Sequence, residues 1–205
     1  VVLKESEIDG LDAIGGASAG DLLDGLVYKS YAYKHIEDGV DPDASRPDLR
    51  VFIDFGYSIN SDYSITDPTK SDLFTILLHE FTHDLGIASR ILVSDAPVVY
   101  NTTGPYTKWD YLLYYGASTN AIGSSGTLRS GAEIGSHSQN SVSFKSSSLN
   151  EYFPVTSVFP ATLGTSYSHF DVFQRGTYNV MSPEGSVGSI NREWNDVEIL
   201  ALCEL

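Results

Sequence analysis

The chain has 205 residues with 12 basic and 27 acidic side chains, which give a formal net charge of −15 at neutral pH. This acidic balance argues against a nucleic-acid or anionic-membrane partner, because phosphate groups are bound by clustered Lys and Arg. A hydrophobic content of 41% excludes a disordered chain, and no apolar run approaches the ~18 residues of a transmembrane helix. The single cysteine, Cys203, excludes a disulfide framework and a cysteine-based zinc knuckle. We expect one domain over residues 1–205 and leave its oligomeric state open.

Residues 1–48 are interpreted as a lead-in of modest helical content that carries no recognisable motif. A glycine-rich break precedes Asp21, which is a candidate N-cap for a helix that includes Leu22 and Val27. Asp41 and Asp43 follow in a loop rich in aspartate and proline. Calcium could bind such a pair of carboxylates, but the rest of an EF-hand loop is missing, and we favour a solvated turn.

Residues 49–86 are predicted to form a strand followed by the strongest helix of the chain. Apolar residues alternate over 49–55, which is typical of a strand. The helix is expected to begin after a cap at Ser71 or Asp72 and to end before Gly86. Its apolar residues recur at helical spacing: Leu73, Ile76, Leu77, Phe81 and Leu85.

Residues 87–205 are expected to be rich in loops. Serine and glycine dominate 116–150, where we predict one short strand from Val142 to Phe144. Aromatic residues on both sides of this stretch indicate that it belongs to the same domain and is not a linker. A closing helix is predicted from Trp194 to Leu205. The sequence therefore predicts an α+β fold.

His79, Glu80 and His83 form a His-Glu-x-x-His pattern inside the strongest predicted helix. Residues four apart lie on one face of a helix, so both imidazoles can bind one metal ion. Zinc fits because it prefers neutral imidazole, and Glu80 can take a proton from a zinc-activated water. Chance would give this pattern about 0.006 times in a chain of this composition, so we favour a zinc motif over two surface histidines.

A catalytic zinc site needs a third ligand from the protein. The position three residues after Gly86 is Ser89, which cannot replace histidine, so the ligand must come from farther along the chain. We favour His169, which lies 12 residues before Met181, the only methionine of the chain. Residues 179–183 are predicted to form a tight turn whose soft methionine side chain packs beneath the metal site.

Ser168 and Asp171 lie beside His169 and are candidates to orient its imidazole by a hydrogen bond. Two other histidines and two glutamates are alternative third ligands. One histidine lies in the most flexible tract, and the other lies in an aspartate-rich loop before the helix. A glutamate would bind as in thermolysin-type sites, but neither candidate lies on a convincing helix. The four alternatives are His137, His35, Glu133 and Glu151.

Together these motifs resemble a known family. His-Glu-x-x-His-x-x-Gly at 79–86, Ser-His-x-Asp at 168–171 and Met-x-Pro at 181–183 are similar to the motifs of metzincin-type metallopeptidases. In the leishmanolysin-like arrangement an insertion separates the glycine from the third histidine, as here. Bacterial secreted metallopeptidases with the same ending resemble the chain more closely still. The resemblance covers about residues 49–205.

This resemblance implies a secreted zinc endopeptidase that acts on protein or peptide substrates. It implies a metzincin-like fold, in which a short twisted sheet and an active-site helix precede a smaller, irregular C-terminal part with the Met-turn. It also implies a role for each matching residue. His79, His83 and His169 would bind zinc, Glu80 would be the general base, and Met181 would be the turn residue.

Two features depart from the family pattern. Asp84 stands where the family commonly has a small or apolar residue. No tyrosine near Met181 clearly matches a residue that stabilises the transition state, although Tyr178 is available. The alternative function is a non-catalytic secreted module for metal binding or adhesion. Glu80 argues against it, because a purely structural metal site has no use for a carboxylate beside its ligands.

Overall fold

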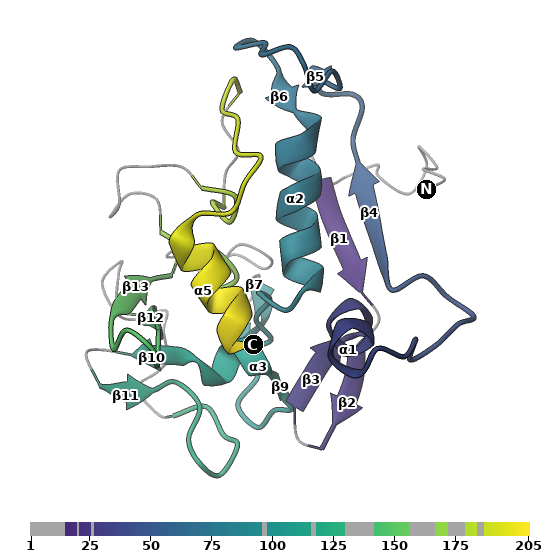
Figure 1. Ribbon diagram of the computed structural model, residues 1–205. Helices are drawn as coiled ribbons and strands as arrows, with labels where there is room; N and C mark the ends of the chain where they lie inside the picture. The colour runs from purple at the N-terminus through teal and green to yellow at the C-terminus, as the bar shows by residue number, and fades with distance from the viewer. Residues whose placement is uncertain are drawn as a thin grey trace.

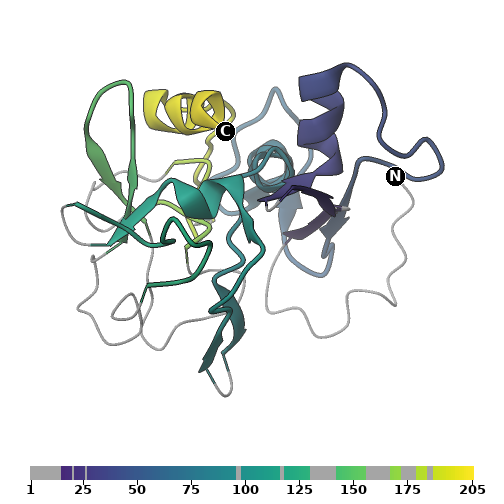
Figure 2. The same ribbon diagram turned by 90° about the horizontal axis from the view of Figure 1, so that it is seen from below.

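The computed structural model describes residues 15–19, 21–25, 27–95, 98–115, 118–129, 142–155, 167–171, 179–183 and 187–205. Within these residues the fold mixes short strands in small sheets with a few helices, in agreement with the predicted α+β class. None of the helices in these ranges is long and apolar enough to cross a membrane. Helix α2 lies in the middle, with α1 on one side and α5 on the other (Figures 1 and 2).

Where a helix was expected after Asp21, the structure has strands. Strand β2 (Asp21–Asp24) pairs antiparallel with β3 (Val27–Ser30). Gly25 lies between them with φ +65°, a conformation that glycine adopts without steric cost. The helix prediction was wrong for two reasons. This turn interrupts the spacing of the leucines, and the pairing of the two strands overrides a weak local preference for helix.

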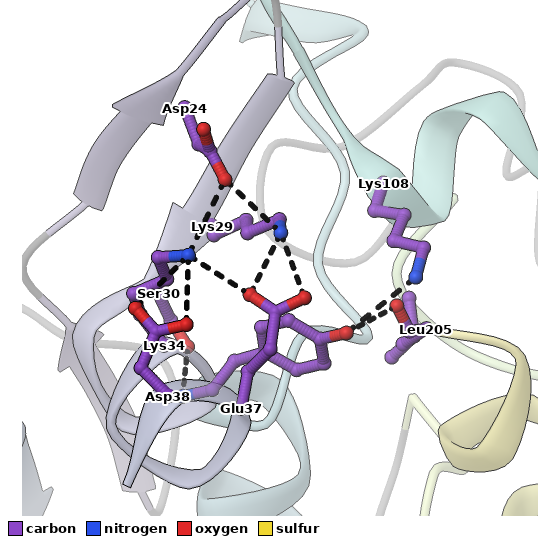
Figure 3. Close-up of polar contacts among 9 residues, drawn as sticks. Asp24, Lys29, Ser30, Lys34, Glu37, Asp38, Lys108 and Leu205 are labelled. Atoms are coloured by element: carbon purple, nitrogen blue, oxygen red, sulfur yellow. Dashed lines mark hydrogen bonds and ion pairs between the residues drawn. The ribbon is translucent and has the colours of Figure 1, made fainter. Parts of the chain in front are cut away.

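Helix α1 (Tyr31–Asp38) follows β3 and is tied to the β2–β3 hairpin by ion pairs. The Lys29 ammonium on β3 lies 2.8 Å from the Glu37 carboxylate on α1, and the Lys34 ammonium on α1 lies 3.4 Å from the Asp24 carboxylate on β2. Figure 3 shows both lysines among three acidic side chains, those of Asp24, Glu37 and Asp38. Such exposed pairs contribute little to the free energy of folding, so their main effect is on the orientation of α1.

A two-stranded antiparallel sheet, β1 (Gly15–Ala19) with β4 (Leu49–Ile53), packs beside α2 (Leu73–Asp84) (Figure 1). The structure confirms both the predicted strand and the predicted helix. The Asp72 side chain caps α2 by accepting a hydrogen bond from the Thr75 N–H at 2.9 Å. The helix ends one residue before Leu85, near the predicted boundary.

The C-terminal part contains a four-stranded antiparallel sheet in the order β11-β10-β12-β13. Strand β12 (Val142–Lys145) confirms the predicted strand, and α5 (Asp196–Glu204) confirms the predicted closing helix. The other three strands were not predicted: β10 (Leu113–Tyr115), β11 (Thr119–Asn120) and β13 (Tyr152–Pro154). They are too short to carry a clear alternating pattern.

The remaining elements are short connections. A four-residue helix, α3 (Lys108–Tyr111), follows directly after β9, which pairs parallel with β3. A two-residue parallel pair precedes α2, and an antiparallel pair follows it. These strands are β5 (Ile59–Asn60), β6 (Ser71–Asp72), β7 (Leu92–Asp95), β8 (Val98–Tyr100) and β9 (Tyr106–Thr107).

The buried core joins α3, β12 and the segment 167–171. Trp109 stacks on Phe144 with 5.4 Å between ring centroids, and Phe170 meets its edge at 5.8 Å. The Trp109 indole N–H donates a hydrogen bond to the Tyr167 carbonyl at 2.7 Å. Aromatic pairs of this kind contribute about 0.5–1.5 kcal/mol each beyond their buried area. The core therefore fixes the segment that carries His169.

Candidate metal centre

Three histidines meet beside α2. His79 and His83 lie one turn apart on this helix, and the segment 167–171 brings His169 against them. The Nε2 atoms are 3.1 Å apart in the pair His79 and His83, and 3.2 Å apart in each pair with His169. The structure thus brings together the three residues predicted from the sequence as metal ligands.

Two backbone carbonyls determine which ring nitrogens point into this triangle as acceptors. The Nδ1 of His79 lies 2.6 Å from the Val180 carbonyl oxygen, and that of His83 lies 2.7 Å from the Ile87 carbonyl oxygen. A carbonyl oxygen only accepts hydrogen bonds, so each Nδ1 carries the proton. In the neutral ring Nε2 then has a lone pair, and the lone pairs of both imidazoles face the same point.

The donor set fits a zinc ion. Zinc–nitrogen bonds of about 2.0–2.1 Å in a tetrahedron place the ligand atoms about 3.3–3.4 Å apart, close to the spacing observed here. Three imidazoles leave a fourth position open, as in catalytic zinc sites, whereas calcium and magnesium require oxygen ligands. A cation between the three nitrogens would also remove the repulsion between their lone pairs.

Burial keeps the two helix imidazoles, those of His79 and His83, neutral at neutral pH. It lowers the pKa of His79, and together with the neighbouring His79 it lowers the pKa of His83 to about 3. His169 is also buried, at 4% exposure. Metal binding requires the deprotonated imidazole, so the site presents its ligands in the form that binds.

Glu80 lies next to His79 on α2 and is 5% exposed. Burial, and then the charge of Asp84 one turn further on, raise the pKa of Glu80 to about 8. A nearby divalent cation would oppose this shift and favour the carboxylate. Asp84, the departure from the family pattern, is therefore a buried acidic neighbour of the proposed base.

The loop after α2 is held by Asp110, a residue that the sequence analysis missed. Asp110 is fully buried on α3, and its carboxylate accepts hydrogen bonds from the Ser89 hydroxyl at 2.6 Å and the Arg90 N–H at 3.0 Å. It also forms a capping box with Thr107, and the Thr-x-x-Asp pattern was the available signal. This network fixes the loop whose Ile87 carbonyl orients His83.

Ser89 and Ser168 connect that loop to the third histidine. The Ser89 N–H donates a hydrogen bond to the Ser168 hydroxyl oxygen at 3.0 Å. The Asp171 N–H, on the other side of His169, donates to the Pro154 carbonyl at 3.0 Å. These contacts of Ser168 and Asp171 anchor the backbone around His169. That either side chain orients the imidazole of His169 stays a prediction.

Residues 179–183 form a turn, as predicted, and Met181 is fully buried. The Met181 carbonyl accepts a hydrogen bond from the Phe170 N–H at 2.9 Å. Because Phe170 follows His169 directly, this contact sets the Met-turn (residues 179–183) beside the third histidine. The turn also supplies the Val180 carbonyl that orients His79.

The alternative ligands do not join this cluster where the structure describes them. His35 lies on α1 and not in a loop as expected, and its Nδ1 is 3.0 Å from an Asp48 carboxylate oxygen. With Asp41 these two residues form a separate, partly exposed group that could hold a metal. Glu151 is exposed just before β13. Three further residues named above lie outside the described residues: Glu133, His137 and Tyr178.

The aspartate loop forms the turn favoured above. An Asp41 carboxylate oxygen accepts a hydrogen bond from the Asp43 N–H at 2.9 Å, and the Asp43 carboxylate pairs with Arg46 at 2.6 Å. The hydrogen bond from Ser45, followed by that from Arg46, holds the pKa of Asp43 below its usual range. Calcium binding at this loop stays untested.

No protein-family model, curated protein or solved structure matches this chain. The functional argument therefore depends on the site itself. The site consists of a partly buried triangle of histidine nitrogens, with the buried Glu80 on the helix that carries His79 and His83.

Proposed function

We propose that the protein is a secreted, zinc-dependent endopeptidase of the metzincin type that hydrolyses protein or peptide substrates. The observation that carries this proposal is the convergence of three Nε2 atoms within 3.1–3.2 Å of one another. The Nδ1 contacts of His79 and His83 further indicate that both rings present a lone pair to the same point. A surface cluster of histidines would have neither the burial nor this orientation.

The chemistry follows from what the residues beside the triangle can do. A bound zinc ion lowers the pKa of water and polarises a carbonyl oxygen. Glu80 accepts the proton of the attacking water and then delivers it to the amine that leaves. The backbone carbonyls of Val180 and Ile87 hold the two helix imidazoles in the metal-binding tautomer.

The metzincin assignment within this proposal is supported by the order of the parts. The proposed active-site helix α2 ends shortly before Gly86. This glycine has φ +121°, a conformation that residues with a side chain rarely adopt. The third histidine comes from the distant segment 167–171, and the Met-turn accepts a backbone hydrogen bond from Phe170, the next residue of that segment. Secretion is proposed from the acidic, nearly cysteine-free composition, and a full-length gene without an export signal would contradict it.

The test combines metal analysis with a digestion assay. The purified chain should contain one zinc per molecule and degrade casein, and a chelator should abolish cleavage. Glu80→Gln should keep the zinc and lose at least ~10²-fold in turnover, because it removes the general base. Glu193→Gln, the same change at an exposed position, should leave both unchanged.

Two outcomes would contradict the proposal. Near-normal cleavage by Glu80→Gln would remove Glu80 from the mechanism. A protein that binds zinc at the three histidines and cleaves no protein substrate would instead be the non-catalytic metal-binding or adhesion module.

A further inference from the structure

We propose that Glu198 is a positioning residue of the metal centre, because its carboxylate fixes the turn whose Val180 carbonyl orients His79. The inference rests on the proposed function only in taking the histidine triangle as a zinc site. It concerns a side chain on α5, outside every motif that the sequence analysis singled out.

Glu198 holds the Met-turn directly. One of its carboxylate oxygens, Oε1, accepts a hydrogen bond from the Met181 N–H at 2.6 Å. The side chain is completely buried, and a carboxylate in such a place is costly unless its oxygens are hydrogen-bonded. The short contact to Met181 is therefore a specific link between α5 and the turn.

The role of Glu198 in capping α5 does not explain this contact. Its other oxygen, Oε2, accepts from the Asn195 N–H at 2.9 Å, which is its part of the capping box. The Asn195 side chain completes the cap by accepting from the N–H groups of Val197 and Glu198. Capping boxes need neither a buried glutamate nor a bond to a distant segment.

The turn in contact with Glu198 lies between two of the proposed zinc ligands. On one side the Val180 carbonyl accepts a hydrogen bond from His79 Nδ1 at 2.6 Å. On the other side the Met181 carbonyl accepts from the Phe170 N–H at 2.9 Å, next to His169. A shift of this turn would move both contacts at once, so one buried carboxylate positions parts of the site from two distant segments.

The experiment measures zinc affinity by competition with a chromophoric chelator, and the visible spectrum of the cobalt(II) form. Three variants are compared with the wild-type chain: Glu198→Met, Glu198→Gln and Asn195→Ala. Loss of groups that orient metal ligands typically weakens metal binding by 10–100-fold. Because Glu198 acts through the turn, we expect about a 10-fold loss for Glu198→Met, at the low end of that range.

The other two variants separate positioning from stability. Glu198→Gln keeps one carbonyl acceptor but turns an amide NH₂ toward one of the two N–H groups, so we expect an intermediate loss of about 3-fold. Asn195→Ala removes the side-chain cap of α5 and leaves the bond to Met181. It should lower the unfolding temperature and keep zinc affinity and the cobalt spectrum unchanged.

The proposal is overturned if Glu198→Met binds zinc within about 2-fold of the wild type with the same cobalt spectrum, or if Asn195→Ala loses as much affinity. If Glu198→Met does not fold, an unchanged affinity and spectrum in Glu198→Gln overturns it equally. These readouts do not need peptidase activity. A wild-type chain that binds zinc and cleaves nothing refutes the proposed function alone, whereas one that binds no zinc refutes both proposals.

Discussion

Helix α2 and the C-terminal segments that meet it contribute to the candidate metal centre in different ways. Within α2, the four-residue spacing of His79 and His83 follows from helix geometry, and the helix is set by its own cap and apolar residues. His169 lies 86 residues beyond His83, and contacts from Trp109 and Met181 hold its segment. The two helix ligands are thus specified locally, while the third depends on tertiary structure.

The largest effect should follow from removing His169, the proposed ligand whose position depends on tertiary structure. His169→Ala is expected to lose most of the bound zinc and all activity, because two helix histidines alone do not make a catalytic zinc site. The measurement is zinc stoichiometry and casein cleavage, with circular dichroism to confirm that α2 is retained. His35→Ala changes a histidine on α1 outside the triangle. It should leave casein cleavage and the zinc held by the triangle unchanged, and any zinc that it loses would come from the separate group with Asp41 and Asp48.

His137 offers a sharper form of the same comparison, because it was an alternative third ligand in the sequence. His137→Ala should leave zinc content and activity nearly unchanged. If His137→Ala empties the site while His169→Ala does not, the assignment of the third ligand is wrong. The metzincin resemblance of the C-terminal part would then fail with it.

The same division between local and tertiary information explains what the sequence could predict. Helix α2, strand β4 and helix α5 were predicted because caps and apolar spacing lie within each segment. The hairpin β2–β3 was mistaken for a helix because its pairing decides between two weak local preferences.

The same reasoning applies to the site. His169 could be proposed by elimination, by its position shortly before Met181 and by resemblance, since no local pattern places it against α2. Asp110 and Glu198 act through backbone N–H groups of segments far from them in sequence. Their capping boxes were visible in the sequence, but the distant segments that they hold were not.

An intermediate effect is expected at the ion pair that joins the two regions. Arg192, in the C-terminal segment, donates hydrogen bonds to both carboxylate oxygens of Asp72, which caps α2. Burial favours the protonated acid, but the hydrogen bonds from Arg192 and Thr75 outweigh it and hold the pKa of Asp72 below its usual range. Asp72→Asn keeps a capping oxygen and removes the charge. It should lower the free energy of unfolding at pH 7 by about 3 kcal/mol.

The stabilisation by Asp72 should decrease as the pH is lowered into the acid range. A carboxyl group whose pKa is lowered by folding stabilises the fold fully above its unfolded pKa of about 3.9, and this contribution is lost as the pH falls through the folded value. Urea unfolding at several pH values should therefore show the gap between wild type and Asp72→Asn constant above about pH 5 and shrinking below pH 4. If the difference in free energy of unfolding stayed constant into strong acid, the charge of Asp72 would not be what stabilises its contact with Arg192.

The smallest effect is expected at the side chain of Met181. The contacts that this turn makes with the site come from the backbone: the Val180 carbonyl to His79, and the Met181 N–H and carbonyl to Glu198 and Phe170. Met181→Leu preserves all of them and nearly conserves the buried volume, and such swaps usually cost less than about 1.5 kcal/mol. Zinc affinity should stay within about 2-fold of the wild type, well short of the loss expected when a group that orients a ligand is removed. Chelator competition and thermal unfolding of this variant measure the two quantities separately. A large loss of zinc with little loss of stability would show that the methionine side chain itself shapes the metal centre, and that the backbone of the turn is not sufficient.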